Sequence, residues 1–150
     1  LPAMRARNSG HIINIGSISG SLPMQGIAVY SATKSFVDSF TTALYRELVG
    51  TRIRVSVVRP GPVRTEFFDR SEQQAGGQRI PAERFAVTPE AVGRTVAGLL
   101  RRPRRVAYVP GWLGFVPWVE PLFGGLIDRL GPLLLRRSAS ARGQAIGPVH

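Results

Sequence analysis

The strongest constraint on the fold is a pair of β-branched runs that flank a helical pattern. Residues Gly10–Ser17, rich in isoleucine, predict a short buried strand, and Arg52–Arg59 predict a second strand that Pro60-Gly61-Pro62 ends. Between them, the segment Ser35–Val49 predicts an amphipathic helix, because its apolar residues recur at helical spacing. The predicted apolar stripe consists of Phe36, Phe40, Leu44 and Leu48, with Val37 beside them.

A strand, a helix and a further strand in this order form a crossover unit, which implies parallel strands with a right-handed connection. We therefore predict an α/β fold built on a parallel sheet. Ligands of open parallel sheets bind beyond the carboxyl ends of the strands. Ser17 and the Pro60-Gly61 pair stand at those ends, while Tyr30 and Lys34 lie near the start of the helix, at the same edge.

Tyr30 and Lys34 are four residues apart and share one helix face, so their polar ends converge. Lys34 is also the only lysine in the chain. A free tyrosine has a pKa near ~10 and must lose roughly 3 units, about 4 kcal/mol, to exchange protons near neutrality. A lysine charge about 5 Å away supplies roughly 3 kcal/mol at an effective dielectric of about 20. The alternative is an ordinary interfacial tyrosine beside a solvated lysine.

Three segments together resemble a known family. Asn14–Ser17, Tyr30–Lys34 and Arg59–Thr65, in this order and spacing, resemble the C-terminal half of a short-chain dehydrogenase/reductase. The resemblance implies a doubly wound, Rossmann-type sheet and an NAD(P)-dependent oxidoreductase that interconverts an alcohol and a carbonyl. The alternatives from other classes are a non-catalytic scaffold that keeps this fold and a protein of the membrane surface.

The resemblance also assigns roles to residues. Ser17 would steady the substrate oxygen, Tyr30 would donate or accept the proton, and Lys34 would hold the nicotinamide ribose and lower the tyrosine pKa. The residues expected beside the nicotinamide and phosphates are Pro60, Gly61, Val63 and Thr65, together with Tyr30 and Lys34. Without the resemblance, Ser17 is a plain strand-ending hydroxyl and Pro60-Gly61 a plain turn. The cofactor is NAD or NADP, which this half of the sequence does not distinguish.

Two departures from the family pattern stand out. Gly16-Ser17 replaces the more usual pair of serines, and only 16 residues precede Ser17, too few for the family's glycine-rich phosphate loop. We therefore expect the chain to be a fragment of a longer protein or a truncated copy. By itself it is expected to be marginally stable and inactive, because it cannot hold the adenosine end of the cofactor.

The expected organisation has two parts. Residues 1–111 are the C-terminal half of the nucleotide-binding domain, with 66–86 as a loop that closes over the substrate. In this part, Thr88-Pro89 predicts a helix start and Arg105–Val109 a last strand. The predicted buried face of that helix consists of Val92, Val96, Leu99 and Leu100. Candidates to line a substrate pocket are Ser19, Leu22 and Met24; the phenylalanines Phe67, Phe68 and Phe85 are either substrate contacts or core anchors.

Residues 112–150 are expected to form an apolar, proline-interrupted tail with a disordered end. Prolines and charges within 112–135 argue against a transmembrane helix. Trp112, Phe115, Trp118 and Phe123 instead suggest an interfacial membrane anchor, a subunit contact or a lid. We expect a cytoplasmic protein, with peripheral membrane contact left open.

Composition excludes some function classes. The chain has no cysteine, so it has neither disulfides nor a thiolate nucleophile, and His11 and His150 are too far apart for a metal site. The net charge of +11 suggests nucleic-acid binding as a possible function. We do not favour it, because the arginines are dispersed along the chain and lack interleaved aromatic residues. The expected partners are a small alcohol or carbonyl substrate, weakly favoured to be apolar, and further copies of the chain.

Overall fold

The computed structural model describes residues 1–23, 27–64 and 86–140. It divides into two compact units, Leu1–Pro117 and Trp118–His150. The predicted residues Met24, Thr65, Phe67, Phe68 and Phe85, and most of the predicted substrate loop, lie outside the described ranges.

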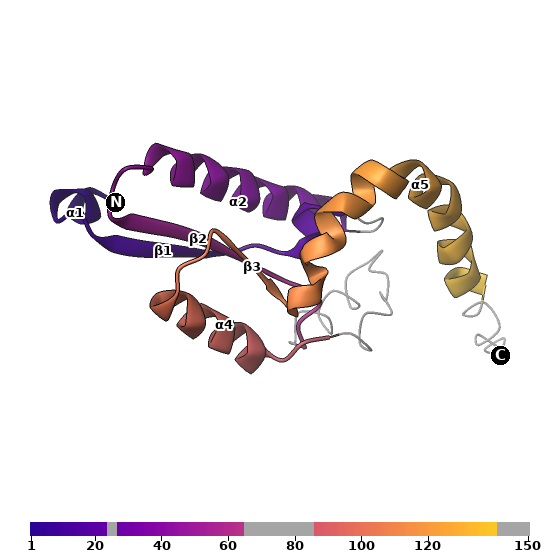
Figure 1. Cartoon of the computed structure of the whole chain (residues 1–150). Helices are drawn as coiled ribbons and strands as arrows, with labels where there is room; N and C mark the ends of the chain where they lie inside the picture. The colour runs from indigo at the N-terminus through magenta and orange to yellow at the C-terminus, as the bar shows by residue number, and fades with distance from the viewer. Residues whose placement is uncertain (24–26, 65–85, 141–150) are drawn as a thin grey trace, which may run out of the picture. The chain divides into compact units, whose positions relative to one another are not determined.

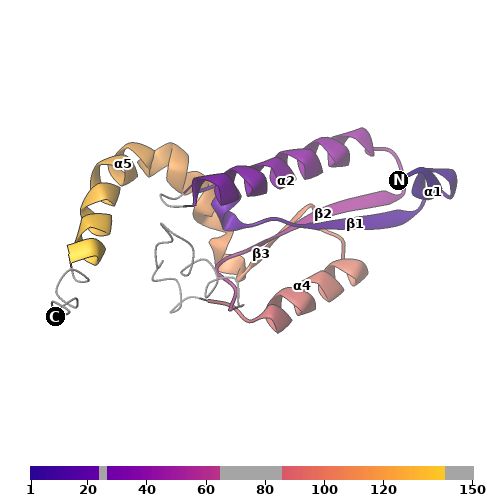
Figure 2. The same cartoon turned by 180° about the vertical axis from the view of Figure 1, so that it is seen from behind.

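Unit 1 contains a parallel sheet with a helix on each face. Its strands are β1 (Gly10–Ile15), β2 (Ile53–Pro60) and β3 (Val106–Val109), ordered β1-β2-β3 with both pairs parallel. Helix α2 (Ala28–Glu47) connects β1 to β2 on one face, and α4 (Pro89–Arg101) precedes β3 on the other, as Figures 1 and 2 show from opposite sides. The predicted parallel crossover is confirmed.

Strand β2 has residues buried on both faces, and its apolar residues Ile53, Val55, Val57 and Val58 supply core contacts to both. On the α2 side, Ile53 and Val55 pack with Leu44 and Leu48 at the end of α2. On the α4 side, the core cluster consists of Val58, Leu99 and Val109. The short helix α1 (Pro2–Ala6) adds Met4 to the α2 side of this core.

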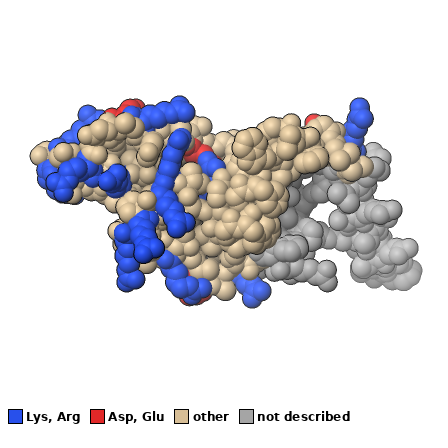
Figure 3. All heavy atoms as spheres, in the orientation of Figure 1, with Lys and Arg blue, Asp and Glu red and all other residues tan. Residues whose placement is uncertain are grey.

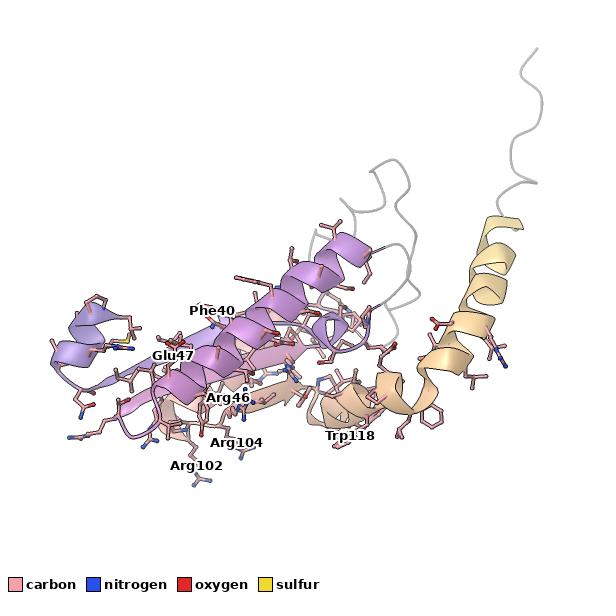
Figure 4. All side chains as sticks on the ribbon, turned by 90° about the horizontal axis from the view of Figure 1, so that it is seen from above. Phe40, Arg46, Glu47, Arg102, Arg104 and Trp118 are labelled. Carbon is pink, nitrogen blue, oxygen red and sulfur yellow. The ribbon has the colours of Figure 1, made fainter. Side chains whose placement is uncertain are left out.

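The predicted apolar stripe of α2 is wrong in its first half. Phe36 and Phe40 are 69% and 50% exposed and stack on each other with ring centroids 6.1 Å apart; Phe40 is labelled in Figure 4. Successive i, i+4 positions advance by about 40° around a helix, so three steps rotate the row by about 120°. Only the end of the row therefore faces the sheet. The buried residues of α2 are Ser31, Asp38, Thr41 and Leu44.

Helix α4 begins as predicted. The Thr88 hydroxyl oxygen accepts a hydrogen bond from the Ala91 N–H at 3.3 Å, and Pro89 occupies the first helical turn. Leu99 is buried at 3% exposure, but Leu100 is 64% exposed, so its predicted burial is wrong. The two residues are adjacent, and successive helix residues lie about 100° apart.

Exposed arginines gather at the amino edge of the sheet, opposite the edge where ligands of this architecture bind. Figure 3 shows blue side chains over this end of unit 1 with few red ones among them, and Figure 4 labels Arg46, Arg102 and Arg104 there. Each of the exposed arginines at this edge lies close to the start of a strand or to the end of a helix. The exposed arginines so placed are Arg5, Arg7, Arg46, Arg52, Arg54, Arg101, Arg102, Arg104 and Arg105.

The 3₁₀ turn η3 (Gly111–Phe115) closes unit 1, with Leu113 buried. It leads into α5 (Val116–Ser140), whose residues from Trp118 onward are the described part of unit 2. The helix continues through Pro121 and Pro132, where the sequence predicted breaks. Figure 1 shows α5 bent, as expected where proline removes a backbone donor inside a helix. No helix in the described ranges is long and apolar enough to span a bilayer.

Candidate active site

Ser17 lies just past the carboxyl end of β1 and is 5% exposed. It caps the 3₁₀ turn η1 (Ile18–Gly20), because its hydroxyl oxygen accepts a hydrogen bond from the Ser19 N–H at 3.2 Å. The cap fixes the position of the Ser17 oxygen, and the hydroxyl keeps its own proton as a donor.

Tyr30 and Lys34 lie in the first turns of α2, at the same edge of the sheet. The Lys34 ammonium is 5.7 Å from the centroid of the Tyr30 ring. Lys34 also donates a hydrogen bond to the Ile15 carbonyl, the last of β1, at 3.1 Å. The Lys34 ammonium therefore contacts both the Tyr30 ring and the end of the strand that leads into Ser17. The three predicted residues lie at one edge of the sheet.

The turn η1 is packed closely against α2. The Ser35 hydroxyl donates to the Gly20 carbonyl at 2.7 Å. A Cβ on Gly20 would lie 2.9 Å from the backbone carbonyl carbon of Lys34, so only glycine permits this approach. Ser17 and Lys34 are thus held relative to each other by backbone packing as well as by hydrogen bonds.

The segment after β2 is pinned between β3 and the start of α4. Gly61 N–H donates to the Val109 carbonyl at 2.8 Å, and Val63 forms a parallel bridge with Val87. A Cβ on Gly61 would lie 2.9 Å from Leu113 Cδ1. Pro60 therefore ends β2, and Gly61 and Val63 follow it at the same edge of the sheet as Ser17.

Sequence reasoning missed a charged network below this edge. Asp38, one turn after Lys34 on α2, accepts a hydrogen bond from Arg59 Nε at 3.1 Å through its Oδ1. Arg59 Nη1 donates to the Tyr108 hydroxyl on β3 at 2.8 Å. Two sequence signals pointed to it: a carboxylate on the helix face of Lys34, and an arginine next to the apolar pair Val57-Val58 at the end of the predicted strand.

The Asp38–Arg59 pair is largely withdrawn from solvent, with side chains 9% and 14% exposed. Burial raises the pKa of the Asp38 carboxyl, although the nearby Arg59 and Lys34 charges act against that rise. For Arg59, burial lowers the pKa, but the Asp38 charge and the hydrogen bonds to Asp38 and Tyr108 raise it by more. Burial thus acts against both charges of the pair, and each partner offsets part of that cost for the other.

His11 is far from this edge and has a structural environment. Its Nε2 lies 2.8 Å from the Ser56 hydroxyl, which donates to the Arg104 carbonyl at 2.6 Å. Because the serine proton is committed to the carbonyl, His11 Nε2 is the donor. Within the described ranges, no cluster of three or more His, Cys, Asp or Glu side chains is placed to hold a metal ion.

Comparisons with known proteins identify the architecture. A family profile described as "short chain dehydrogenase" matches residues 1–76. The chain is 42% identical over 111 residues to the NADP-dependent 3-hydroxy acid dehydrogenase YdfG of Salmonella typhi, covering 71% of this chain and 44% of that protein. Serine dehydrogenase from Escherichia coli matches with 38% identity and a TM-score of 0.54, over 71% of this chain and 41% of that one.

A short-chain dehydrogenase from Sphingobium yanoikuyae in complex with NADPH matches with 26% identity and a TM-score of 0.63, over 99% of this chain and 52% of that one. The chain thus spans about half the length of the proteins it matches. These neighbours confirm the predicted fold class, the C-terminal part of a doubly wound Rossmann-type sheet. With a matching profile over half of its residues, the chain belongs to the short-chain dehydrogenase family.

Proposed function

We propose that this chain carries the catalytic half of an NAD(P)-dependent oxidoreductase that interconverts an alcohol and a carbonyl. The observation that carries the proposal is the Lys34 ammonium 5.7 Å from the Tyr30 ring, tied to the strand end that leads into Ser17. Residues 1–111 are proposed as the half of the nucleotide-binding domain that holds this site, with 66–86 over the substrate and 112–150 as a tail.

The chemistry of the side chains fits a nicotinamide cofactor and a carbonyl substrate. An ammonium has three donors, and the Ile15 carbonyl accepts one, which leaves two for the ribose hydroxyls. The Tyr30 hydroxyl is the proposed proton donor for carbonyl reduction and the acceptor for alcohol oxidation. Ser17 is proposed to donate its hydroxyl proton to the substrate oxygen, while Pro60, Gly61, Val63 and Thr65 flank the nicotinamide. When bound, the cofactor supplies or takes up the hydride.

The test replaces Tyr30 by Phe in the whole protein translated from the reading frame that contains this chain. We expect the rate with NADP or NAD to fall by about 10²–10⁴-fold, as for loss of a general acid or base. Tyr45→Phe is the matched control, because it makes the same chemical change on the same helix, at a 38% exposed residue. Circular dichroism checks that both variants keep the parent fold.

Two outcomes would contradict the proposal. Either the parent shows no NAD(P)-dependent turnover with any alcohol or carbonyl, or Tyr30→Phe is as active as Tyr45→Phe. The first outcome favours the non-catalytic scaffold, whereas the second assigns the proton transfer to a group other than Tyr30. The substrate panel contains apolar secondary alcohols, which the sequence favours, and 3-hydroxy acids, because a named relative acts on them. NADP is tried first, since that relative is NADP-dependent.

We also propose that the protein is a cytoplasmic homo-oligomer. Support for the association comes from the solvent-facing side of α2, where Phe36 and Phe40 stack and Val29 is 80% exposed. Association through this face buries apolar side chains that a monomer leaves in water. Phe36→Asp with Phe40→Asp should shift the oligomer to monomer in sedimentation velocity; an unchanged mass would contradict the proposal.

Peripheral membrane contact is a further proposal for the tail. The exposed side chains of α5 include Trp118, Leu122, Phe123, Leu126 and Leu130, and an apolar helix surface of this kind partitions into a lipid interface. Deleting 118–150 should abolish co-sedimentation of the protein with vesicles of mixed anionic and zwitterionic lipid. A full-length protein that stays in the supernatant would leave the subunit-contact or lid reading in its place.

A further inference from the structure

Three consecutive strands place residues at one level beneath the site. Arg59 and Tyr108 are register partners on β2 and β3. Gly16 directly follows Ile15, the last residue of β1, whose partner is Val58, so Gly16 lies level with Arg59. Partners at one level of a parallel sheet point to the same face, here the face covered by α2. The missing side chain at Gly16 leaves room at this level for a side chain from the helix.

The Asp38 carboxylate occupies that room. A Cβ on Gly16 would lie 2.8 Å from Asp38 Oδ1, and a Cβ on Gly20 would lie 2.8 Å from Asp38 Oδ2. The carboxylate therefore packs against both Gly16 and Gly20, the two ends of the segment that contains Ser17. The departure from the family's serine pair now has a physical account: a serine at position 16 would collide with Asp38.

Stability does not explain this arrangement. Asp38 is 7% exposed, and its Oδ2 has no hydrogen-bond partner within the described residues. A buried carboxylate with one unpaired oxygen costs more than the same space filled by an apolar side chain. Burial also raises the pKa of Asp38 despite the Arg59 and Lys34 charges. A polar group kept at such a cost beside a candidate site is typical of functional residues.

The groups that face Asp38 come from every element around it. Lys34 lies one turn earlier on α2, Arg59 comes from β2, and Tyr108 reaches Arg59 from β3. The strand end at Gly16 and the turn η1 add no titratable side chain. Among the described groups at this level, Asp38 is thus the one carboxylate. It lies between two cations, Lys34 of the candidate site and Arg59 of the sheet.

We propose that Asp38, held by Arg59, is a positioning residue of the active site: its carboxylate supports the turn that carries Ser17, and its charge opposes the Lys34 ammonium. This inference rests on the proposed function. Arg59 offsets most of the Asp38 charge at a distance, so that the intact pair leaves the field at Tyr30 close to neutral. Removing either partner alone then changes that field, in opposite directions.

The expected size follows from helix geometry. Asp38 lies eight residues beyond Tyr30, about 12 Å along the axis at about 1.5 Å per residue. At an effective dielectric of about 20–40, one unit charge at this distance shifts a titration by about half to one pH unit. Alcohol oxidation rises with pH as the tyrosine loses its proton. Loss of the Asp38 charge favours the phenolate, so the rise should move to lower pH.

The experiment measures kcat/KM for alcohol oxidation against pH in the whole protein. Asp38→Asn should move the half-maximal pH down by about half to one unit, and Arg59→Gln should move it up by about as much. The double variant Asp38→Asn with Arg59→Gln should return the profile to that of the parent. Tyr108→Phe is the control, since it removes a hydroxyl from the network without changing its charge.

A purely structural network would lower activity in all these variants without moving the profiles, and that result would overturn the inference. Failure of all three charge variants to fold, judged by circular dichroism, would also overturn it. Failure of the proposed function is distinguishable, because the parent itself then shows no NAD(P)-dependent turnover. Activity in the parent with coincident profiles for all variants rejects the role of Asp38 alone.

Discussion

Replacing Gly16 by Ser tests the packing of Asp38 beneath the Ser17 turn. The new Cβ would lie 2.8 Å from Asp38 Oδ1, closer than real Cβ contacts, and 3.1 Å from Val57 Cγ2, which is tighter than most of them. Val57 is 2% exposed and belongs to the central strand β2, so it has little freedom to move. The carboxylate must therefore shift, which stretches its 3.1 Å contact with Arg59.

The cost is that of overpacking a closely packed site, about 1–3 kcal/mol of unfolding free energy. Truncation of Asp38 to Ala removes the nearer of the two clashing atoms. In that background the cost of Gly16→Ser should be smaller by at least about 1 kcal/mol, a coupling typical of residues in contact. The Asp38→Ala change is itself destabilising because Arg59 is left unpaired, but the double-mutant cycle cancels that term.

The assay is urea unfolding of the four proteins of the cycle, followed by circular dichroism. Gly93→Ser is the control, since a Cβ at Gly93 meets no heavy atom within 4 Å; in the middle of α4 it should be neutral or slightly stabilising. If the costs of Gly16→Ser and Asp38→Ala simply add, the carboxylate does not occupy the space beneath the turn, and the packing argument is wrong.

Two further predictions concern the rest of unit 1. Burial and the Arg54 charge lower the pKa of His11 below its ordinary value of 6.5. As the pH falls, His11 is therefore protonated in the unfolded chain before it is protonated in the folded one. The stability due to neutral His11 is present above pH 6.5 and lost as the pH falls below it. His11→Gln should flatten this part of the dependence of stability on pH in thermal melts. Leu99→Ala should cost about 2–5 kcal/mol in urea unfolding, because Leu99 is buried between α4 and the sheet. Its exposed neighbour gives the control, with Leu100→Ala within about 0.5 kcal/mol of the parent; equal costs would contradict the burial assigned to the two leucines.

The parallel sheet could be predicted because its signals are local. The isoleucine-rich run before Ser17 and the β-branched run before Pro60 each contain enough apolar residues to predict a buried strand. The helix between them leaves a parallel crossover as the favoured connection. The start of α4 at Thr88-Pro89 is local in the same way, since a capping hydroxyl and a proline act within one turn. These predictions needed no knowledge of what each element packs against.

The face that α2 buries could not be predicted in this way. The apolar repeat pointed to Phe36 and Phe40, whereas the structure buries Asp38 and Thr41. Asp38 is accommodated by Arg59, which lies 21 residues away in sequence. Thr41 accepts a hydrogen bond from Asn14 on β1 at 2.8 Å. A periodicity argument assigns polar residues to solvent, and it fails where their partners come from other strands.

The face of α2 that packs on the sheet is polar and charged near the candidate site and apolar at the far end of the helix. The residues proposed to serve function are therefore different from those that stabilise the fold. Near the site, Lys34 and Asp38 contact backbone and charged groups of the sheet. At the far end, Leu44 and Leu48 pack into the apolar core with β2. Burial of such leucines contributes about 1.5–3 kcal/mol each, whereas the buried ion pair contributes little net stability. The apolar contacts of the distal half of α2 therefore hold the helix on the sheet. Their stabilisation offsets the free-energy cost of the buried charges in the proximal half, which lies at the edge where Ser17, Tyr30 and Lys34 meet.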